Sequence, residues 1–302
     1  MNVNNLKNIL PATLNHGNIC LPSLRSYESA KKILSKTNLI FCASVGREGS
    51  GFVGELFSNE PRCISFHESR PFSNGYRTIQ NSMGSVYASN MVNRFKLRKI
   101  ADSISRSSAE TYIESNHMFI KTFGKELLYN MDLDFTLVSL RRPLSNSLKS
   151  FAELDWFGGV YSRASNWIYK INSFSPLNRD GLILESLLDE AIAYIISEKL
   201  NESLFLSSDK KKRITYEKFS VPPTKESVSR LKTKLRIPGN LDNEVGKKNA
   251  RSSDKLFTFS NDYCRQAILD FGMKNQLELK RREIEIDPNT HILRVRDEIW
   301  DL

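Results

Sequence analysis

The chain has 302 residues, of which 40% are hydrophobic and 26% charged, so it can bury a sizeable core and global disorder is excluded. Its four scattered cysteines exclude a disulfide-stapled scaffold, and no CxxC or Cys/His cluster indicates a metal site. The longest apolar runs fall far short of the ~20 residues that span a bilayer, and the first residues lack the pattern of a signal peptide. We therefore expect a reduced, cytoplasmic protein with no transmembrane segment, for which peripheral membrane contact stays open.

The positive charge is concentrated in one stretch. The whole chain carries a net charge of +10, and residues 209–255 hold 14 basic and 6 acidic residues, a net charge of +8. Such a local field favours an anionic ligand: a phosphate-bearing cofactor, an acidic saccharide or a nucleic acid. A solvated basic face is the alternative. Proline and glycine breaks at 222–223 and 237–240 predict a long loop or lid in this stretch.

Helical and strand patterns alternate along the chain, which predicts an α/β fold with a mostly parallel central sheet flanked by helices. Residues 1–37 form an irregular lead-in, and residues 38–302 a single domain. That domain divides into a cofactor-binding core (38–155) and a helical, basic lid or acceptor portion (156–302). We predict strands at 38–45, 62–67, 111–114 and 135–140, and helices at 27–35, from 52, at 82–105, 143–154, 182–200 and 261–275.

A glycine-rich turn between the first strand and the following helix is the strongest local signal. Gly46 and Gly51 have the G-x-x-x-x-G spacing that lets backbone N–H groups and a helix N-terminus face one phosphate. A nucleotide triphosphatase next requires Lys and Ser/Thr, but this chain has Phe52 and Val53 there. The loop therefore suits phosphate binding and is badly equipped to hydrolyse ATP.

The positively charged side chain, Arg47, lies inside the loop instead. Here the sequence resembles the 5′-phosphosulfate loop of the P-loop sulfotransferases. The similarity lies in Arg47, Gly49, Ser50 and an aromatic residue just after them. The sequence departs from the family at two positions. At Glu48 the family has a small residue, so the side chain of Glu48 must point away from the anion. At Gly51 the family has a residue with a hydroxyl group. The resemblance implies that 3′-phosphoadenosine 5′-phosphosulfate contacts Arg47, Glu48, Gly49, Ser50, Gly51 and Phe52.

A second motif follows the predicted strand at 135–140. Sulfotransferases bind the cofactor's 3′-phosphate with an arginine at a strand end and a serine eight residues later. Arg142 and Ser150 have this spacing, and Phe151 follows the serine as in the family. The resemblance therefore implies that Arg142 and Ser150 hold the 3′-phosphate. A register shifted by one residue, with Arg141 and Lys149, is the alternative.

The resemblance implies a metal-free transfer of a sulfuryl group to an acceptor hydroxyl on a saccharide, a glycolipid or a small alcohol. Arg47 would stabilise charge on the bridging oxygen, and the acceptor needs a general base. Glu68 is the first candidate base and His67 the second, because they follow the second strand at the sheet edge where ligands bind. His117, after the third strand, is the other candidate.

Further acceptor and phosphate contacts are expected near these motifs. Glu114, Asn116 and His117 are candidates to bind acceptor hydroxyls. Late in the chain Lys247, Lys248 and Arg251 resemble, in composition only, the basic segment with which the family covers the 3′-phosphate; a flexible charged loop is the alternative.

Two other functions remain open at this point, a P-loop phosphotransferase and a non-catalytic module that binds an anion or a nucleic acid. The basic stretch contains few aromatic residues for base stacking, so no stable nucleic-acid partner is expected. The sequence leaves the acceptor's identity and the oligomeric state undetermined.

Overall fold

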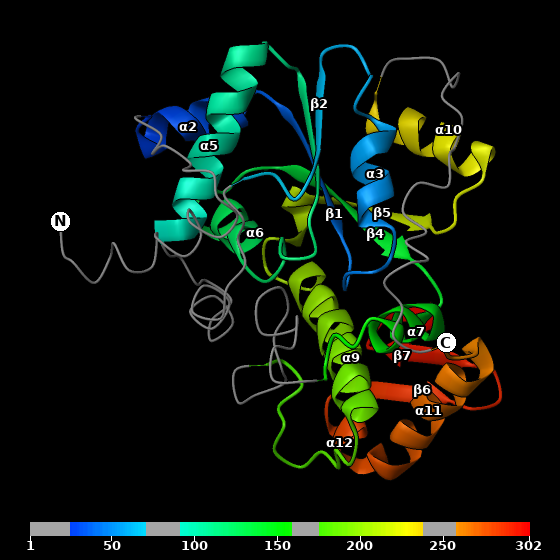
Figure 1. Cartoon of the computed structure of the whole chain (residues 1–302). Helices are drawn as coiled ribbons and strands as arrows, with labels where there is room; N and C mark the ends of the chain where they lie inside the picture. The colour runs from blue at the N-terminus through cyan, green and yellow to red at the C-terminus, as the bar shows by residue number, and fades with distance from the viewer. Residues whose placement is uncertain (1–24, 71–90, 159–174, 238–257) are drawn as a thin grey trace. The chain divides into compact units, whose positions relative to one another are not determined.

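A computed structural model describes residues 25–70, 91–158, 175–237 and 258–302 (Figure 1). The chain forms two compact units. Unit 1 comprises Met1–Ser44, Gly49–Leu140 and Ser208–Asn249; unit 2 comprises Val45–Glu48, Arg141–Ser207 and Ala250–Leu302. Each unit is described by itself below.

Unit 1 is built on a five-stranded, all-parallel sheet with the order β2-β3-β1-β4-β5. Its central strand β1 pairs in register with both neighbours, so that Ile40 lies opposite Ile113 on one side and Thr136 on the other. The fold class predicted from the sequence, α/β with a parallel central sheet flanked by helices, is thus confirmed. The strands are β1 (Asn38–Ala43), β2 (Cys63–His67), β3 (Thr111–Ser115), β4 (Phe135–Arg141) and β5 (Ile214–Ser220).

Helices cover both faces of this sheet, which explains the continuous apolar run of β1 (Figure 1). Ile40 and Cys42 face a core shared with α3 (Ser50–Leu56) and α10 (Lys225–Leu235). Phe41 points to the other face, where its ring stacks on Phe119 with the centroids 4.2 Å apart. Helices α2 (Tyr27–Leu34), α5 (Met91–Ser107) and α6 (Phe123–Lys125) lie on that side.

The prediction of a long loop within residues 209–255 is wrong for the described part of this stretch, which contains β5 and α10. Phe219 is the one fully buried side chain of strand β5, and charged residues interrupt the strand, so its apolar pattern is weak. The two prolines only connect the strand to the helix. Thr224 then caps α10 by accepting a hydrogen bond from the N–H of Ser227.

Unit 2 is organised around α9 (Leu187–Leu206), which contacts α7 (Leu144–Glu153), α11 (Asn261–Lys274) and strand β7. The sequence placed the start of this helix at 182. The structure starts it at Leu187, because the side chain of Ser186 accepts the N–H of Asp189 and closes a capping box. Beyond its first turn, α9 is buried on nearly every side.

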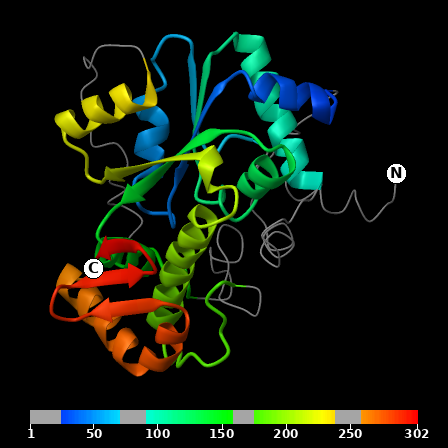
Figure 2. The same ribbon diagram turned by 180° about the vertical axis from the view of Figure 1, so that it is seen from behind.

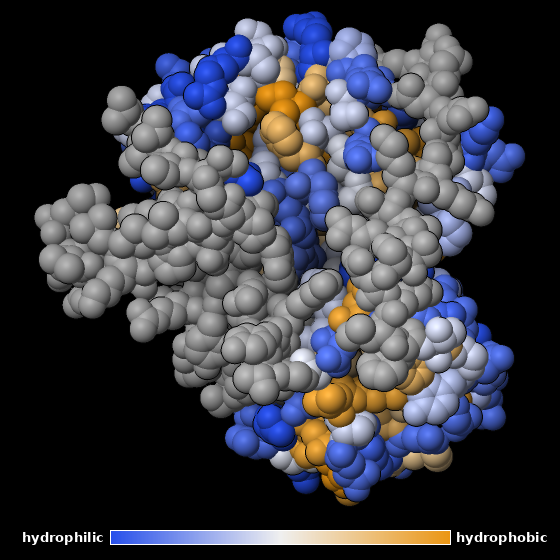
Figure 3. Space-filling model, in the orientation of Figure 1, coloured by the Kyte–Doolittle hydropathy of each residue, from blue (hydrophilic) through white to orange (hydrophobic). Residues whose placement is uncertain are grey.

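A three-stranded antiparallel sheet completes unit 2 (Figure 2). Its strands β6 (Ile284–Asp287), β7 (Ile292–Val295) and β8 (Glu298–Asp301) follow the short helix α12 (Gln276–Arg281). The C-terminal portion is helical as predicted, but this sheet was not foreseen, because each strand is only four residues long. Leu293, Val295 and Trp300 are the buried side chains of β7 and β8. Met273 on α11 and Leu277 on α12 are exposed. The space-filling view shows apolar patches on the surface of unit 2 (Figure 3).

Within the described ranges, no helix has the length and apolar character needed to cross a membrane.

Candidate functional site

The glycine-rich segment after β1 forms a tight turn with an unusual backbone. Gly46 and Gly49 have φ angles of 89° and 88°, and Arg47 between them has a φ of 59°. This left-handed region is costly for residues with a side chain, so Arg47 needs contacts that hold it there. A Cβ atom on Gly49 would also lie 2.9 Å from a methyl carbon of Val221, so the turn requires glycine at this position.

The two sulfotransferase-like motifs meet within unit 2. The Nε of Arg47 donates a hydrogen bond to the Oγ of Ser150 at 2.9 Å, although the two residues are 103 positions apart. The guanidinium of Arg142 donates to the backbone carbonyl of Arg47. Arg142 forms no ion pair with a carboxylate in the described part of the chain. Burial lowers the pKa of Arg142, and the charge of Glu48 opposes this effect only in part. Two guanidinium groups and a hydroxyl therefore gather around one turn.

Arg141 and Lys149, the residues of the alternative register, contact other parts of unit 2. Arg141 donates to Glu298 at 2.6 Å and to the carbonyl of Ile299 at 3.1 Å, and its guanidinium lies 4.3 Å from the centre of the Trp300 ring. It therefore attaches strand β8 to the rest of unit 2. The Nζ of Lys149 lies 3.8 Å from the Oε1 of Glu153 on the same helix. Of the two registers, the one with Arg142 and Ser150 is therefore the one whose side chains contact Arg47.

The side chain of Glu48 turns into the interior. Its Oε1 lies 2.8 Å from the Nζ of Lys199, and its Oε2 accepts the N–H of Val45 at 2.9 Å. Burial raises the pKa of Glu48, and the charge and hydrogen bond of Lys199 oppose that rise. Lys199, on α9, was not foreseen as a residue of this site, because nothing in its helical sequence context distinguishes it from a surface lysine.

The remaining loop residues belong to unit 1. Ser50 is buried at the start of α3, and its backbone carbonyl accepts the hydroxyl of Ser115 at 2.5 Å. Gly51 follows within α3. Phe52 packs against the core between the sheet and the helices α3 and α10. At the position where a nucleotide triphosphatase has its lysine, this chain thus has a core aromatic residue.

Two histidines and a glutamate gather in unit 1 where β2 and β3 end. Glu68, with a φ of 52°, places its Oε1 2.5 Å from the Nδ1 of His117. Burial raises the pKa of Glu68, but the charge and hydrogen bond of His117, with His67 and Lys96 nearby, outweigh burial and lower it to about 2. A carboxyl group with this pKa is a weak base at neutral pH. The geometry thus brings Glu68 and His117 together at this edge, and the carboxylate of Glu68 orients the ring of His117.

His67 lies on the same sheet edge but is bound to the neighbouring strand. Its Nδ1 lies 3.2 Å from the hydroxyl and 3.3 Å from the carbonyl of Ser115. These contacts fix the ring on β3 rather than on an acidic side chain. His67 remains a candidate by position, with less support than His117.

Glu114 is fully buried and fully engaged. Its carboxylate accepts hydrogen bonds from the backbone and side chain of Ser69, the Tyr112 hydroxyl, the Asn116 amide and Lys96, whose Nζ is 2.7 Å away. With both oxygens occupied in this way, Glu114 supports the edge from inside, and it does not fit the predicted role of binding acceptor hydroxyls.

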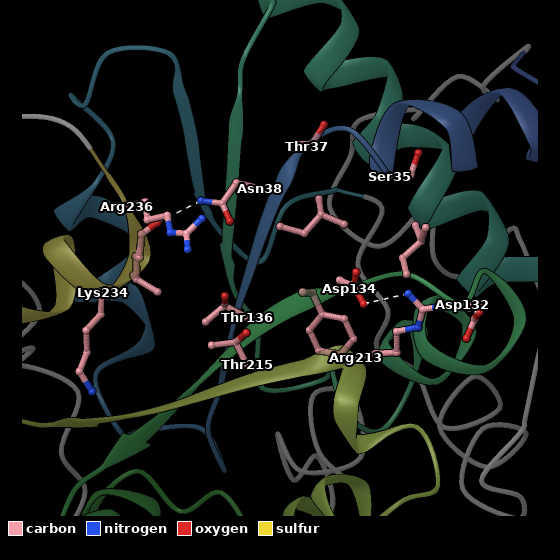
Figure 4. A pocket seen from close by; sticks show the side chains of 14 residues that line it. Ser35, Thr37, Asn38, Asp132, Asp134, Thr136, Arg213, Thr215, Lys234 and Arg236 are labelled. Atoms are coloured by element: carbon pink, nitrogen blue, oxygen red, sulfur yellow. Dashed lines mark hydrogen bonds and ion pairs between the residues drawn. The ribbon is translucent and has the colours of Figure 1, made fainter.

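A cavity of about 510 Å³ lies elsewhere in unit 1, at the start of strands β1, β4 and β5 (Figure 4). Arg213, from the basic stretch, spans Asp132 and Asp134 in its wall, with N–O distances of 2.9 and 3.1 Å. Both aspartates are thus paired with Arg213, and the cavity is at the opposite sheet edge from His67 and His117. Lys232 of the same stretch is buried against Glu60.

The late basic residues Lys247, Lys248 and Arg251, predicted to cover the 3′-phosphate, lie outside the described ranges. Among the residues that the structure describes, no three His, Cys, Asp or Glu side chains are grouped so as to hold a metal ion.

Comparison with known proteins adds no further assignment: no family model, no curated protein and no solved structure matches the chain.

Proposed function

We propose that this protein is a sulfotransferase that moves a sulfuryl group from 3′-phosphoadenosine 5′-phosphosulfate to an acceptor hydroxyl. The observation that carries the proposal is the convergence of Arg47, Arg142 and Ser150 in unit 2. Two motifs that resemble the family's 5′- and 3′-phosphate contacts are far apart in the sequence and adjacent in space. The segments that follow β1 and β4 lie at one sheet edge because these strands are parallel neighbours, so the support comes from which side chains meet there: Arg47 with Arg142 and Ser150, the residues that the resemblance names.

The donor set of this cluster fits an anion with two phosphate groups. Guanidinium groups donate in a fixed fork that matches phosphate oxygens, and a serine hydroxyl adds one more donor. Two neighbouring guanidinium groups in a partly buried place strengthen the positive field that an incoming anion meets. Arg47 would face the 5′-phosphosulfate, and Arg142 and Ser150 the 3′-phosphate.

The proposed step also needs a general base, for which we take His117. It accepts the acceptor's hydroxyl proton while the acceptor oxygen forms a bond to sulfur. The bond between sulfur and the 5′-phosphate oxygen breaks, and adenosine 3′,5′-bisphosphate leaves. Glu68 stabilises the imidazolium that forms.

The acceptor is a saccharide, a glycolipid or a small alcohol, and we place the enzyme in the cytoplasm. The cysteines Cys42, Cys63 and Cys264 are free, as is typical of a reducing compartment. A P-loop phosphotransferase has less support, because Phe52 is a packing residue where phosphoryl transfer needs a cation.

The test is a transfer assay with a sulfur-labelled donor and a panel of saccharide, glycolipid and small-alcohol acceptors, without metal. We expect label on one acceptor class, and a loss of roughly 10²–10⁴ in turnover for His117→Gln with unchanged donor affinity. If no acceptor is labelled although the protein binds adenosine 3′,5′-bisphosphate, the protein is a binding module and the enzyme assignment is wrong.

A further inference from the structure

The loop residue Glu48 has partners that come from a distant helix. Lys199 lies 151 positions later in the chain, yet its Nζ is 2.8 Å from the Glu48 carboxylate. Neither side chain is exposed to solvent by more than 1%. The ring of Trp300, from strand β8, covers the ammonium group with its centre 5.5 Å away.

The same helix also holds the loop's backbone. The hydroxyl of Tyr194 donates to the carbonyl of Val45 at 2.9 Å, and the N–H of Val45 donates to Glu48 at 2.9 Å. Both polar backbone groups of Val45 and the side chain of Glu48 are thereby fixed. Gly46 and Arg47, which have left-handed backbones, lie between these two fixed residues.

Stability alone is a poor reason for this arrangement. A buried ion pair contributes little or nothing compared with well-packed apolar residues of the same volume, because two charges must be removed from water. A buried polar network that is fully hydrogen-bonded does, however, select one backbone geometry over others. The contacts from α9 select the geometry in which Arg47 points to Ser150.

We propose that Lys199 and Tyr194 are positioning residues that hold the 45–48 loop in its anion-binding conformation. The proposal rests on the proposed function only in naming the anion as the sulfuryl donor. Lys199 has a second effect, because it binds the carboxylate of Glu48. Without it, the negative charge of Glu48 is expected to attract the guanidinium groups of Arg47 and Arg142 and to compete with the incoming anion.

The test combines hydrogen exchange of loop peptides with calorimetric affinity for adenosine 3′,5′-bisphosphate. Four variants are compared: Lys199→Met, its charge-conserving control Lys199→Arg, the double variant Lys199→Met/Glu48→Gln, and Tyr194→Phe. The double variant removes both buried charges and is expected to fold even if Lys199→Met does not. Tyr194→Phe deletes one hydroxyl and keeps the ring that packs on Phe151 and Phe157.

In the double variant, we expect amide exchange of residues 45–48 to rise about tenfold or more, with unchanged exchange in β1 and in the rest of α9. Tyr194→Phe should show a smaller rise of about fivefold, the effect of one hydrogen bond. Bisphosphate affinity should fall in the same order, and Lys199→Arg should retain the wild-type values.

Wild-type loop exchange in both the double variant and Tyr194→Phe would overturn the proposal, whatever the melting temperatures. If the wild-type protein does not bind the bisphosphate at all, the proposed function fails, and loop exchange still decides whether α9 positions the loop.

Discussion

The guanidinium of Arg142 donates to the backbone carbonyl of Arg47, a neutral acceptor. Burial lowers the pKa of Arg142, and the charge of Glu48 nearby acts against this effect. Arg141, next to it, is bound to Glu298 and covers Trp300. Two adjacent arginines thus have different tasks: the first attaches a strand, and the second faces the loop. No property of the two residues themselves distinguishes them in the sequence.

We expect Arg142→Ala to weaken binding of adenosine 3′,5′-bisphosphate by roughly 10–100-fold, because one charge-assisted contact to the 3′-phosphate is lost. Affinity for adenosine 5′-monophosphate, which lacks this phosphate, should hardly change. Isothermal titration calorimetry measures both. Lys149→Ala, which removes one positive charge from neighbouring α7, is the matched control and should behave as wild type. Equal losses for both ligands would contradict the assignment.

Glu68 and His117 form the second residue-scale test. In Glu68→Gln the ring of His117 loses the carboxylate that orients it, so we expect turnover to fall by roughly tenfold or more. In His117→Gln turnover should fall by roughly 10²–10⁴, because the proton acceptor itself is lost. Steady-state turnover with the labelled donor measures both, and full turnover in His117→Gln with a large loss in Glu68→Gln would make the glutamate the base after all.

The same pair predicts a pH dependence of stability. The pKa of Glu68 is about 2 in the folded state, below the usual 4.5. Its stabilising contribution is therefore complete above pH 4.5 and is lost as pH falls towards 2. By this shift, the wild type should exceed Glu68→Gln in unfolding free energy by about 3 kcal/mol at most near neutral pH. Denaturant unfolding at a series of pH values should show the difference vanishing below pH 2; a constant difference would contradict the pairing.

At the scale of elements, helix α3 approaches strand β2 very closely. A Cβ atom on Gly54 would lie 2.7 Å from the backbone nitrogen of His67, and the carbonyl of Gly54 accepts the hydroxyl of Ser65 at 2.7 Å. A side chain at this position forces the helix away from the sheet.

Gly54→Ala is therefore expected to destabilise unit 1 by about 1–3 kcal/mol, although alanine favours helices by ~1 kcal/mol. Ser58→Ala, at an exposed site just beyond α3, should stay within about 0.5 kcal/mol of wild type. Thermal unfolding of both variants checks this. A Gly54→Ala protein as stable as wild type would mean that α3 does not pack on β2 as described.

The elements that sequence reasoning found share one property: a strong local pattern. Strand β1 is apolar throughout because both faces are covered, and β4 leads into the arginine–proline sequence that ends it. Strand β5 has only one fully buried side chain, and strands β6–β8 have only four residues each, so none of them has a pattern that distinguishes it from a loop. Their structure depends on long-range packing, such as Trp300 on Lys199.

The residues of the candidate site also fall into those that a local sequence pattern reveals and those that it does not. Arg47, Arg142 and Ser150 were found because their spacing along the chain matches a recognisable pattern. Lys199, Tyr194 and Lys96 were not found, because their roles depend on partners far away in the sequence. The pKa of Glu68 likewise depends on His117, 49 residues later, so the order of the candidate bases could not be set from sequence.

At the scale of the whole molecule, part of the net charge of +10 is engaged in ion pairs. In the described part of the basic stretch, Lys210 and Arg213 pair with Asp132, and Lys232 pairs with Glu60. Cations that are paired in this way contribute little to the field that a nucleic-acid backbone would meet.

We therefore expect only non-specific binding of single-stranded RNA, with a Kd no tighter than about 10⁻⁶ M at physiological salt. Fluorescence anisotropy at several salt concentrations tests this. Binding well below micromolar that persists at 200 mM salt would favour the nucleic-acid module over the enzyme.

The central claim is that the Arg47, Arg142 and Ser150 cluster binds a nucleotide carrying phosphates at both 3′ and 5′ positions. Calorimetric titration of the wild-type protein with adenosine 3′,5′-bisphosphate in the presence of a chelator, and separately with ATP and Mg²⁺, tests it most directly. The account predicts saturable, metal-independent binding of the bisphosphate that is at least about tenfold tighter than that of ATP with Mg²⁺. Binding of ATP only with the metal, or of neither nucleotide, would contradict it.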